Sequence, residues 1–316
     1  MKRHVIICLV VLSLVILPVK ADTIKWVDFT IPYESLKYAM DVDISTSEME
    51  QHIQWINCLA LAGYQTGGRC PFQSVKAAVK SLENDWSPDK LSDEQRRIYD
   101  YYYAAYDAVL GGLLGNFSVE EDGEIRTTYG LKAYSPIAEG YHYCHCSDFG
   151  NRRSFGFARK HLGNDLMGAL GTPIVAVESG VIESLGWNRY GGWRVGIRSM
   201  DSQRYYYYAH LMKDRPYASG LQEGDVVEAG DLIGYMGRTG YSDRENVNNI
   251  ETVHLHFGIQ LVFEESQKEC NSEIWIDAYP IVRLLQNHRS SVVKVDGEWK
   301  RKFGFVDLDI LEYPIS

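Results

Sequence analysis

The sequence has 316 residues, 45% of them hydrophobic, and a formal net charge of −10, which is enough chain for a catalytic domain and a second, smaller unit. The acidic balance argues against a nucleic-acid partner, because no basic stripe is present to neutralise phosphate groups. It also disfavours simple adhesion to an anionic membrane.

The first residues of the chain are typical of an export signal. Basic residues at 1–4 precede an uncharged apolar run from Val5 to Leu17, and Val19-Lys20-Ala21 forms a small-x-small cleavage pattern. The run is shorter than the ~20 residues that a membrane-spanning helix needs. We predict a signal peptide at residues 1–21, with an uncleaved membrane anchor as the alternative. In both cases the bulk of the chain works outside the cytoplasm.

A helical N-terminal region is expected over residues 22–134. Helices are predicted from about Ser45 to Gly63, around Val75–Leu82, and from the capping-box pattern at Ser92–Gln95 to Gly111. The last of these carries many tyrosines, which we interpret as packing residues more than as platforms for stacking sugars: Tyr99, Tyr101, Tyr102, Tyr103 and Tyr106.

After Asp122-Gly123 the sequence changes to short β-type runs separated by glycine. The predicted fold class is therefore α+β, with a β-rich antiparallel-sheet catalytic domain preceded by a small helical region. Strands are expected at Pro173–Val177, Val181–Ser184, Trp193–Arg198, Arg204–His210, Val226–Ala229 and Val253–Gln260.

The cysteines do not fit a complete set of disulfides. Cys8 falls in the predicted signal peptide, and the five that remain cannot all pair within one chain. Cys58 and Cys70 are expected to form a local bridge. Among the other three, Cys144, Cys146 and Cys270, one should stay a thiol or pair with another chain. A second metal site at Cys144-His145-Cys146 is disfavoured because no further paired cysteines lie nearby.

Two histidines that flank one leucine form the strongest functional signal. Side chains at positions i and i+2 of a strand face the same side, so His254 and His256 should look into one cavity. His210 ends an aromatic strand, at an edge where a residue can reach a substrate. Other histidines are interpreted as surface or hydrogen-bonded residues: His52, His145 and His288.

A histidine and a carboxylate complete the candidate metal site. His161 and Asp165 are too far apart to lie side by side on a strand, but Gly163 between them permits a tight turn. A catalytic zinc takes three nitrogen or oxygen ligands from the protein and keeps one position for water. The candidates are five residues, two more than the three ligands needed: His161, Asp165, His210, His254 and His256. Their spacing does not show whether His254 or His256 is the ligand.

Together these motifs resemble peptidase family M23, the lysostaphin-type or LytM-type zinc endopeptidases of bacterial cell walls. The resemblance covers residues 135–261. Ser147–Gly150 with Arg152 or Arg153 is similar to the family's opening Phe-Gly-x-Arg stretch. The other matching motifs are His161–Asp165, Gly171-Thr172-Pro173 with Gly180, Tyr208–Leu211, Gly224–Val227, Gly237–Gly240 and His254–Phe257.

The resemblance implies that His161, Asp165 and His256 bind one zinc ion and that His210 and His254 are catalytic, flanking a zinc-bound water. It implies a peptidase domain at 135–285, a C-terminal extension at 286–316, and a secreted metalloendopeptidase that hydrolyses peptide stems or cross-bridges of cell-wall peptidoglycan. A non-catalytic member that binds peptidoglycan or activates a partner is the alternative.

Two positions depart from the family pattern. The interval from Gly240 to His254 is longer than usual and is expected to form a wall of the substrate groove, and Gly258 stands where many members have glutamate. Groove walls are further sought among aromatic strand residues, with packing in the core as the equal alternative for them. The helical region is considered as an inhibitory segment over the groove. The aromatic candidates are Trp187, Trp193, Tyr206 and Tyr208.

Overall fold

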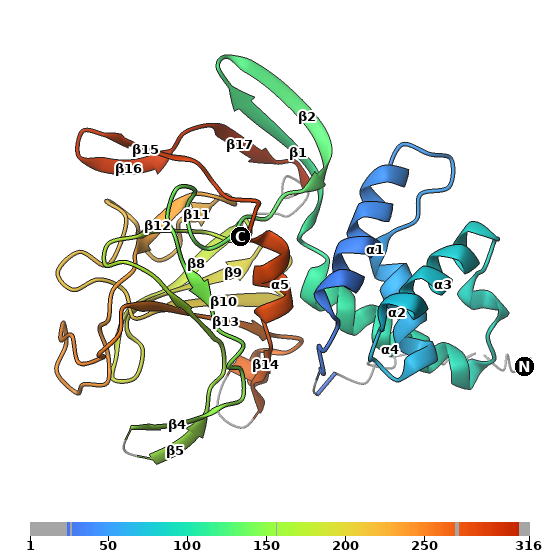
Figure 1. The fold of residues 1–316 in the computed structure, drawn as a ribbon, viewed down its shortest axis with the longest axis horizontal. Coiled ribbons are helices and arrows are strands. Elements are labelled where there is room, and N and C mark those ends of the chain that lie inside the picture. The colour runs from blue at the N-terminus through green and yellow to red at the C-terminus, as the bar shows by residue number, and fades with distance from the viewer. Residues whose placement is uncertain (1–23, 26, 156, 269–271, 310–316) are drawn as a thin grey trace, which may run out of the picture.

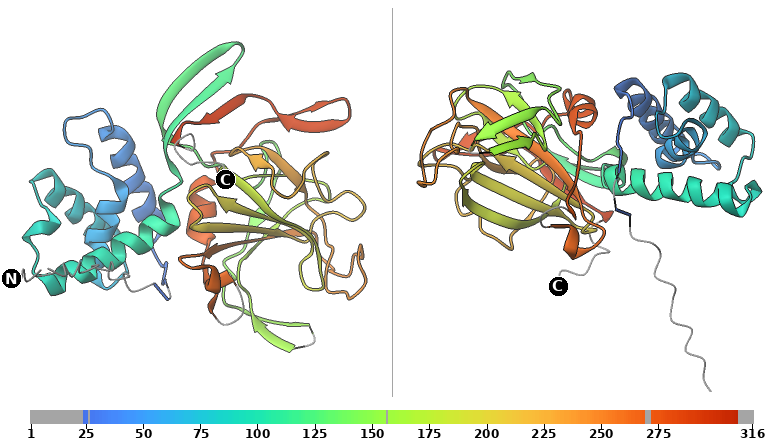
Figure 2. Two further views of the ribbon diagram at one scale, coloured as in Figure 1. Left: turned by 180° about the vertical axis from the view of Figure 1, so that it is seen from behind. Right: turned by 90° about the horizontal axis from the view of Figure 1, so that it is seen from below.

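The computed structural model describes residues 24–309 except 26, 156 and 269–271. The predicted signal peptide, Cys8 and Cys270 lie outside the described residues. A helical N-terminal part sits beside a β-rich part (Figure 1; Figure 2), and the sheets are built from antiparallel pairs, which confirms the predicted α+β class. No helix among the described residues is long and apolar enough to span a bilayer.

The described N-terminal part has four helices, and a short 3₁₀ turn, η1 (Pro88–Lys90), precedes the fourth, α4. Helix α4 has the predicted capping box, in which the Ser92 side chain accepts from the Gln95 backbone N–H and the Gln95 side chain accepts from the Ser92 backbone N–H. The helices are α1 (Tyr33–Thr46), α2 (Trp55–Thr66), α3 (Phe72–Glu83) and α4 (Asp93–Leu110).

The predicted helix from Ser45 to Gly63 is wrong, because two helices share that stretch. A buried carboxylate explains the break: Asp43 accepts from the Trp55 backbone N–H at 2.8 Å and lies 2.6 Å from the His52 ring. The side chain of Asp43 thus satisfies a donor at the start of α2 and holds the intervening chain in a turn.

The predicted Cys58–Cys70 bridge is also wrong. Both cysteines are free and buried. The Cys70 sulfur lies 3.5 Å from the Leu59 carbonyl and 3.5 Å from the Tyr106 hydroxyl, so it is directed into the helix packing. Burial raises the pKa of Cys58 to about 12 and that of Cys70 to about 11, which makes both thiols unreactive core residues.

The main sheet has eight strands in the order β11-β8-β9-β10-β13-β6-β3, with β14 paired to β13. Its central strands lie within a few residues of the predicted ones, because alternating patterns and glycine turns delimit them well. The strands are β3 (Cys144–His145), β6 (Asn164–Met167), β8 (Gly180–Asn188), β9 (Gly192–Ser199), β10 (Arg204–Ala209), β11 (Val226–Val227), β13 (His254–Leu261) and β14 (Ile274–Ile276).

Smaller elements surround this sheet. A hairpin of β1 (Leu114–Glu121) and β2 (Glu124–Leu131) forms a three-stranded sheet with β17 (Gly304–Asp307) from the end of the chain. The remaining elements are the pairs β4 (Arg152–Phe155) with β5 (Phe157–Lys160), β7 (Pro173–Val175) with β12 (Leu232–Tyr235) and β15 (Val292–Val295) with β16 (Glu298–Arg301), together with η2 (Glu265–Lys268) and α5 (Tyr279–Leu285).

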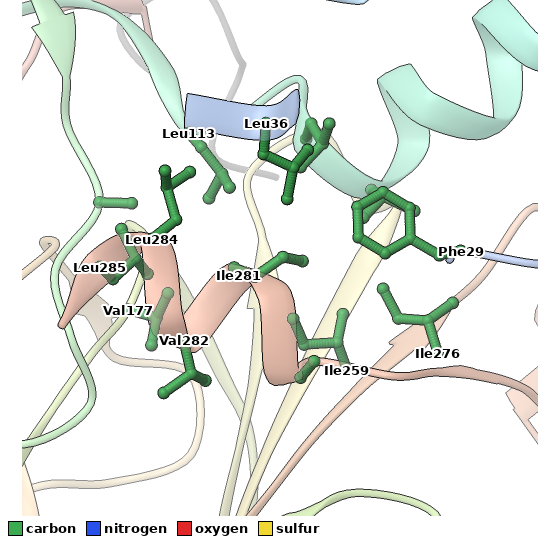
Figure 3. Close-up of a cluster of buried hydrophobic side chains, with 14 of the residues drawn as sticks. Phe29, Leu36, Leu113, Val177, Ile259, Ile276, Ile281, Val282, Leu284 and Leu285 are labelled. Atoms are coloured by element: carbon green, nitrogen blue, oxygen red, sulfur yellow. The ribbon is translucent and has the colours of Figure 1, made fainter. Parts of the chain in front are cut away.

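The two faces of the main sheet differ in what covers them. On one face Ile259 packs against α5, and the apolar residues of α5 meet Phe29, Leu36 and Leu113 from the helical part (Figure 3). Because side chains alternate along a strand, the neighbouring residues on β10 and β13 point to the opposite face. That second face carries the candidate site.

Candidate functional site

Three of the predicted residues converge at one end of the second face of the main sheet, opposite α5. Asp165 on β6 and His256 on β13 are register partners, and His161 lies just before β6. His161 Nε2 lies 2.7 Å from His256 Nδ1, and Asp165 Oδ1 lies 3.1 Å from His161 Nε2 and 3.4 Å from His256 Nδ1. These ligand atoms all lie within 4.8 Å of one another, a spacing at which they could hold one metal ion.

Gly163 is needed here for space and not for a left-handed turn. A Cβ atom on Gly163 would lie 2.6 Å from the Phe257 carbonyl oxygen and 2.7 Å from His256 Nε2. The chain bends at Gly163 with a φ angle outside the left-handed region, so the expected turn needs no positive φ there. The absent side chain lets the His161–Asp165 segment approach β13 closely.

His210, which directly follows β10, and His254, on β13, face the same cluster. The two rings lie 4.8 Å apart, and His254 Nε2 is 3.7 Å from Asp165 Oδ1. Each ring is fixed through Nδ1, which lies 2.9 Å from the Thr239 carbonyl oxygen for His210 and 2.9 Å from the Thr252 carbonyl oxygen for His254. A carbonyl can only accept, so both Nδ1 atoms carry the proton and both Nε2 atoms are left for the cavity.

The backbone of His210 is unusual for a residue with a side chain. Its φ of 63° lies in the left-handed region, which costs energy for residues other than glycine. The His210 N–H donates to the Gly191 carbonyl at 2.7 Å, which helps to hold this conformation. Strain of this kind gathers at functional sites, where it aims a side chain.

Electrostatics favour a charged carboxylate in the cluster. Burial works against ionisation of Asp165, but the imidazole groups of His161 and His256 hold the pKa of that carboxyl well below its usual range. Burial likewise lowers the pKa of His161, yet the carboxylates of Asp148 and Asp165 outweigh it and raise this pKa to about 9. For His210, burial and then repulsion by His254 and His256 keep the pKa well below its ordinary value.

Asp148 and Arg153 form a supporting layer that the residue-by-residue reasoning did not single out. Asp148 Oδ1 accepts from the Asp165 backbone N–H at 3.2 Å, and Asp148 Oδ2 lies 3.2 Å from His161 Nδ1. Arg153 donates to Asp148 at 2.6 Å and to Asp165 at 3.0 Å. In the sequence, only the resemblance of this stretch to the family's opening motif pointed to these residues. That resemblance did not distinguish Arg153 from Arg152, which is exposed in the structure.

A cavity of about 480 Å³ joins the cluster to a groove along the sheet. Tyr205 and Tyr207 line it, whereas Tyr206 and Tyr208 are buried in the core on the opposite face, which is the alternative left open for these two residues. The long interval before His254 contributes Tyr241 to the lining, as expected of a groove wall. The other two aromatic candidates, Trp187 and Trp193, pack edge-to-face with ring centres 5.7 Å apart.

Local packing explains the glycine at position 258. A Cβ atom there would lie 2.8 Å from the Trp275 ring and 2.9 Å from the Leu162 carbonyl oxygen. Trp275 lines the cavity, so in this chain an aromatic ring occupies the space over Gly258. A glutamate at this position would displace that ring.

The histidines interpreted as structural have partners elsewhere in the fold. His145 packs on the Tyr279 ring at 4.3 Å, and burial lowers its pKa to about 4. His288 Nδ1 lies 2.7 Å from the Ala133 carbonyl oxygen, and His52 pairs with Asp43. Within the described part of the chain, the only cluster with metal-ligand spacing is the one at His161.

Comparison with known proteins gives consistent relatives. Residues 159–270 match the model of Peptidase family M23. An L-Ala–D-Glu endopeptidase of Bacillus subtilis is 35% identical over 168 residues, covering 50% of this chain and 48% of that protein. Lysostaphin of Staphylococcus simulans is 38% identical over 98 residues, covering 31% of this chain and 17% of that protein. The matched segment thus spans about half, or less, of these relatives.

A solved structure extends the comparison to the helical part. The crystal structure of a lytM protein from Ruminococcus gnavus has a TM-score of 0.54 and 23% identity, and the match covers 83% of this chain and 90% of that one. At this identity the likeness shows the fold. It includes more of the chain than the family model does.

Proposed function

We propose that this chain is a secreted zinc metalloendopeptidase of peptidase family M23, whose model residues 159–270 match, and that it hydrolyses peptide bonds in bacterial peptidoglycan. The observation that carries the proposal is the convergence of His161, Asp165 and His256 at the end of an open cavity. Two relatives with endopeptidase and lysostaphin names support the reaction and the substrate class.

The donor set fits zinc. Two imidazole nitrogens and one carboxylate oxygen are ligands that zinc prefers, and three protein ligands are typical of a catalytic site. Asp165 Oδ1 is buried without a well-aligned hydrogen-bond donor, as expected of an atom that a cation would satisfy. We propose His161, Asp165 and His256 as the ligands. When bound, zinc would polarise a peptide carbonyl and lower the pKa of water toward ~7.

His210 and His254 are proposed to move protons and to orient the reacting groups. Both present Nε2 to the cavity because Nδ1 donates to a backbone carbonyl. A neutral imidazole can accept a proton from water at Nε2, and its protonated partner can donate to the developing oxyanion or to the leaving amine. The low pKa of His210 keeps its ring neutral and able to accept. Such help contributes ~10²–10⁴-fold to a rate.

Cell-wall substrates place the action outside the cytoplasm, which agrees with the signal peptide proposed for residues 1–21. Wall peptides reach the enzyme as extended chains, and the cavity continues from the metal cluster along the strands of the main sheet. We therefore propose that stems or cross-bridges lie across this face while the scissile bond rests at the His161 end.

A digestion of purified cell walls tests the proposal. The protein is incubated with walls in the presence and absence of a zinc chelator, and released muropeptides are analysed by mass spectrometry. We expect products that disappear with chelator and return when zinc is added back. Release of no product from walls of several cross-bridge types would contradict the proposal and favour a binding role.

A further inference from the structure

Beyond the metal cluster, the same cavity is rich in positive charge. Six of its lining residues are cationic and three are acidic, in a chain whose net charge is −10. Three of these six cations have acidic partners: Arg198 pairs with Glu183 at 2.6 Å, Lys268 pairs with Glu183 at 2.8 Å, and Arg153 pairs with Asp165 at 3.0 Å. Among the described residues, the other three form no ion pair with a carboxylate: Lys160, which is exposed, and two arginines that have a buried donor.

Arg194 on β9 is the first of them. Its Nη1 donates to the Ser184 hydroxyl at 3.0 Å, while its Nε is buried without a hydrogen-bond partner. Among the described residues, Arg194 forms no ion pair with a carboxylate. A buried donor on a guanidinium that lacks a partner is costly, so this arrangement indicates a ligand that supplies an acceptor.

Arg159 on β5 is the second. Its guanidinium lies between two rings, 4.9 Å from the centre of Tyr190 and 5.2 Å from that of Tyr241. Nη2 donates to the Tyr241 hydroxyl at 3.0 Å, and Nη1 is buried without a partner. Within the described part of the chain it also has no carboxylate partner. The two rings hold the guanidinium plane in one orientation, which preorganises its unused donor.

Arg159, Arg194 and Tyr207 line the same cavity. Packing raises the pKa of Tyr207 to about 12, while the charges of Arg194 and Arg159 both act in the opposite direction. On β9 and β10, Val195 pairs with Tyr208, so the next residues along, Arg194 and Ala209, also lie opposite each other. Ala209 in turn pairs with His256 on β13. Two strand spacings, or ~10 Å, therefore separate the backbone of Arg194 from that of His256.

We propose that Arg194 and Arg159 form a carboxylate-binding subsite beside the metal cluster, so that this enzyme selects peptides with a free carboxylate close to the scissile bond. The inference rests on the proposed peptidase function and adds a specificity to it. Guanidinium groups suit this task because they stay charged and offer two parallel donors to a carboxylate. An uncharged glycine cross-bridge would offer these donors only neutral carbonyl oxygens, which bind a guanidinium more weakly than a carboxylate does.

Matched peptides test the subsite. Two synthetic peptides contain the L-Ala–D-Glu bond, one with a free glutamyl carboxylate and one with that group converted to a carboxamide. We expect the wild type to prefer the free acid by about 10- to 100-fold in kcat/KM, as for a charged hydrogen bond. Arg194→Gln and Arg159→Gln should lose most of this preference, because cleavage of the free-acid peptide should fall more than cleavage of the carboxamide peptide.

Control variants separate recognition from folding and from general charge. Arg194→Lys keeps the charge but loses the paired donors, so it should retain part of the preference. Arg126→Gln removes one positive charge from the exposed β1–β2 hairpin and should leave the preference unchanged. Melting temperatures of all variants are compared, and a subsite role predicts little change.

Binding distinguishes failure of this inference from failure of the proposed function. Zinc-loaded His254→Ala, which should not turn over, is titrated by calorimetry with both peptides. Tighter binding of the free acid, abolished by adding Arg194→Gln, supports the subsite even where no hydrolysis is detected. Equal affinity for the two peptides, or equal cleavage of both by the wild type, overturns it.

Discussion

At the scale of single residues, the proposed division between metal ligands and proton-transfer groups predicts two different phenotypes. His161→Ala should abolish zinc retention, because it removes one of three ligands. His254→Ala should keep zinc and lose hydrolysis by ~10²–10⁴-fold, because it removes only proton-transfer help. Metal content by mass spectrometry and turnover are measured on both variants. Equal zinc loss in the two would contradict the assignment.

A second residue-scale prediction concerns close packing behind the cluster. Gly163→Ala would push a methyl group against His256 Nε2 and the Phe257 carbonyl, so it should lower the melting temperature and weaken zinc binding, at a cost of about 1–3 kcal/mol. Gly130→Ala is the control, since its Cβ would lie 3.8 Å from its neighbour, Phe117. A Gly163→Ala protein as stable and as zinc-rich as the control would refute this reading of the glycine.

Sequence patterns identified the five residues of the candidate site but not the side chains that support them. The His-x-His spacing places both rings on one face, and it cannot say which ring meets Asp165 across the register of β6 and β13. Asp148 could not be recognised from spacing alone, because its role depends on a turn that brings it to His161. In β10 the sequence left open which tyrosines face the groove and which face the core, since four successive tyrosines carry no inside-outside pattern.

At the scale of elements, long and well-capped segments were predicted best. The helix α4 and the strands β9, β10 and β13 lie where pattern and turn residues place them. The boundary between α1 and α2 was missed because a long-range contact decides it: Asp43 binds His52 and, from β2, the Tyr129 hydroxyl at 2.8 Å. Local propensity contains no information about such a partner.

One buried arginine ties the helical part to the main sheet, and its removal should be costly. Arg204 is paired with Glu178 at 2.8 Å and with Asp201 at 2.5 Å, and it donates to the Ala108 carbonyl of α4 at 2.8 Å. Arg204→Met would leave buried carboxylates without a partner, so we expect a loss of about 3–5 kcal/mol in denaturant unfolding.

A surface arginine on α4, Arg96, provides the comparison for Arg204. The ion pairs of Arg96 with Asp89 and Asp100 are exposed, so Arg96→Met should leave the unfolding midpoint close to that of the wild type. Similar midpoints for Arg204→Met and Arg96→Met would show that the buried network does not stabilise the junction.

At the scale of the whole molecule, the helical region lies away from the cavity. Among the described residues, those that line the cavity all fall between Arg153 and Trp275, and the helices pack against α5 on the opposite face of the sheet. This arrangement does not support the idea that the region occludes the groove. It instead makes the helices part of the core that positions the site.

Removal of the chain before residue 126 should therefore destabilise the protein without activating it. The deletion takes away Phe29, Leu36 and Leu113 and exposes the apolar side chains of α5 that they cover (Figure 3). We expect a lower melting temperature and no gain in wall hydrolysis, measured against the full-length chain under the same conditions. A stable and more active truncated protein would restore the inhibitory interpretation.

The overall arrangement was the part least accessible from sequence. The class and the order of elements follow from periodicity and turn residues, yet nothing local indicates that β17 at the end of the chain pairs with β1. The shared core of the helices and the sheet is equally non-local, because it joins residues separated by more than two hundred positions, such as Phe29 and Ile276.

X-ray absorption at the zinc edge of the metal-loaded protein tests the central claim most directly. If His161, Asp165 and His256 hold the ion, the spectrum should show one zinc per chain with nitrogen and oxygen neighbours at about 2.0–2.2 Å, two of them imidazoles, and no sulfur at ~2.3 Å. Sulfur ligation, or four imidazoles that close every position, would contradict the account.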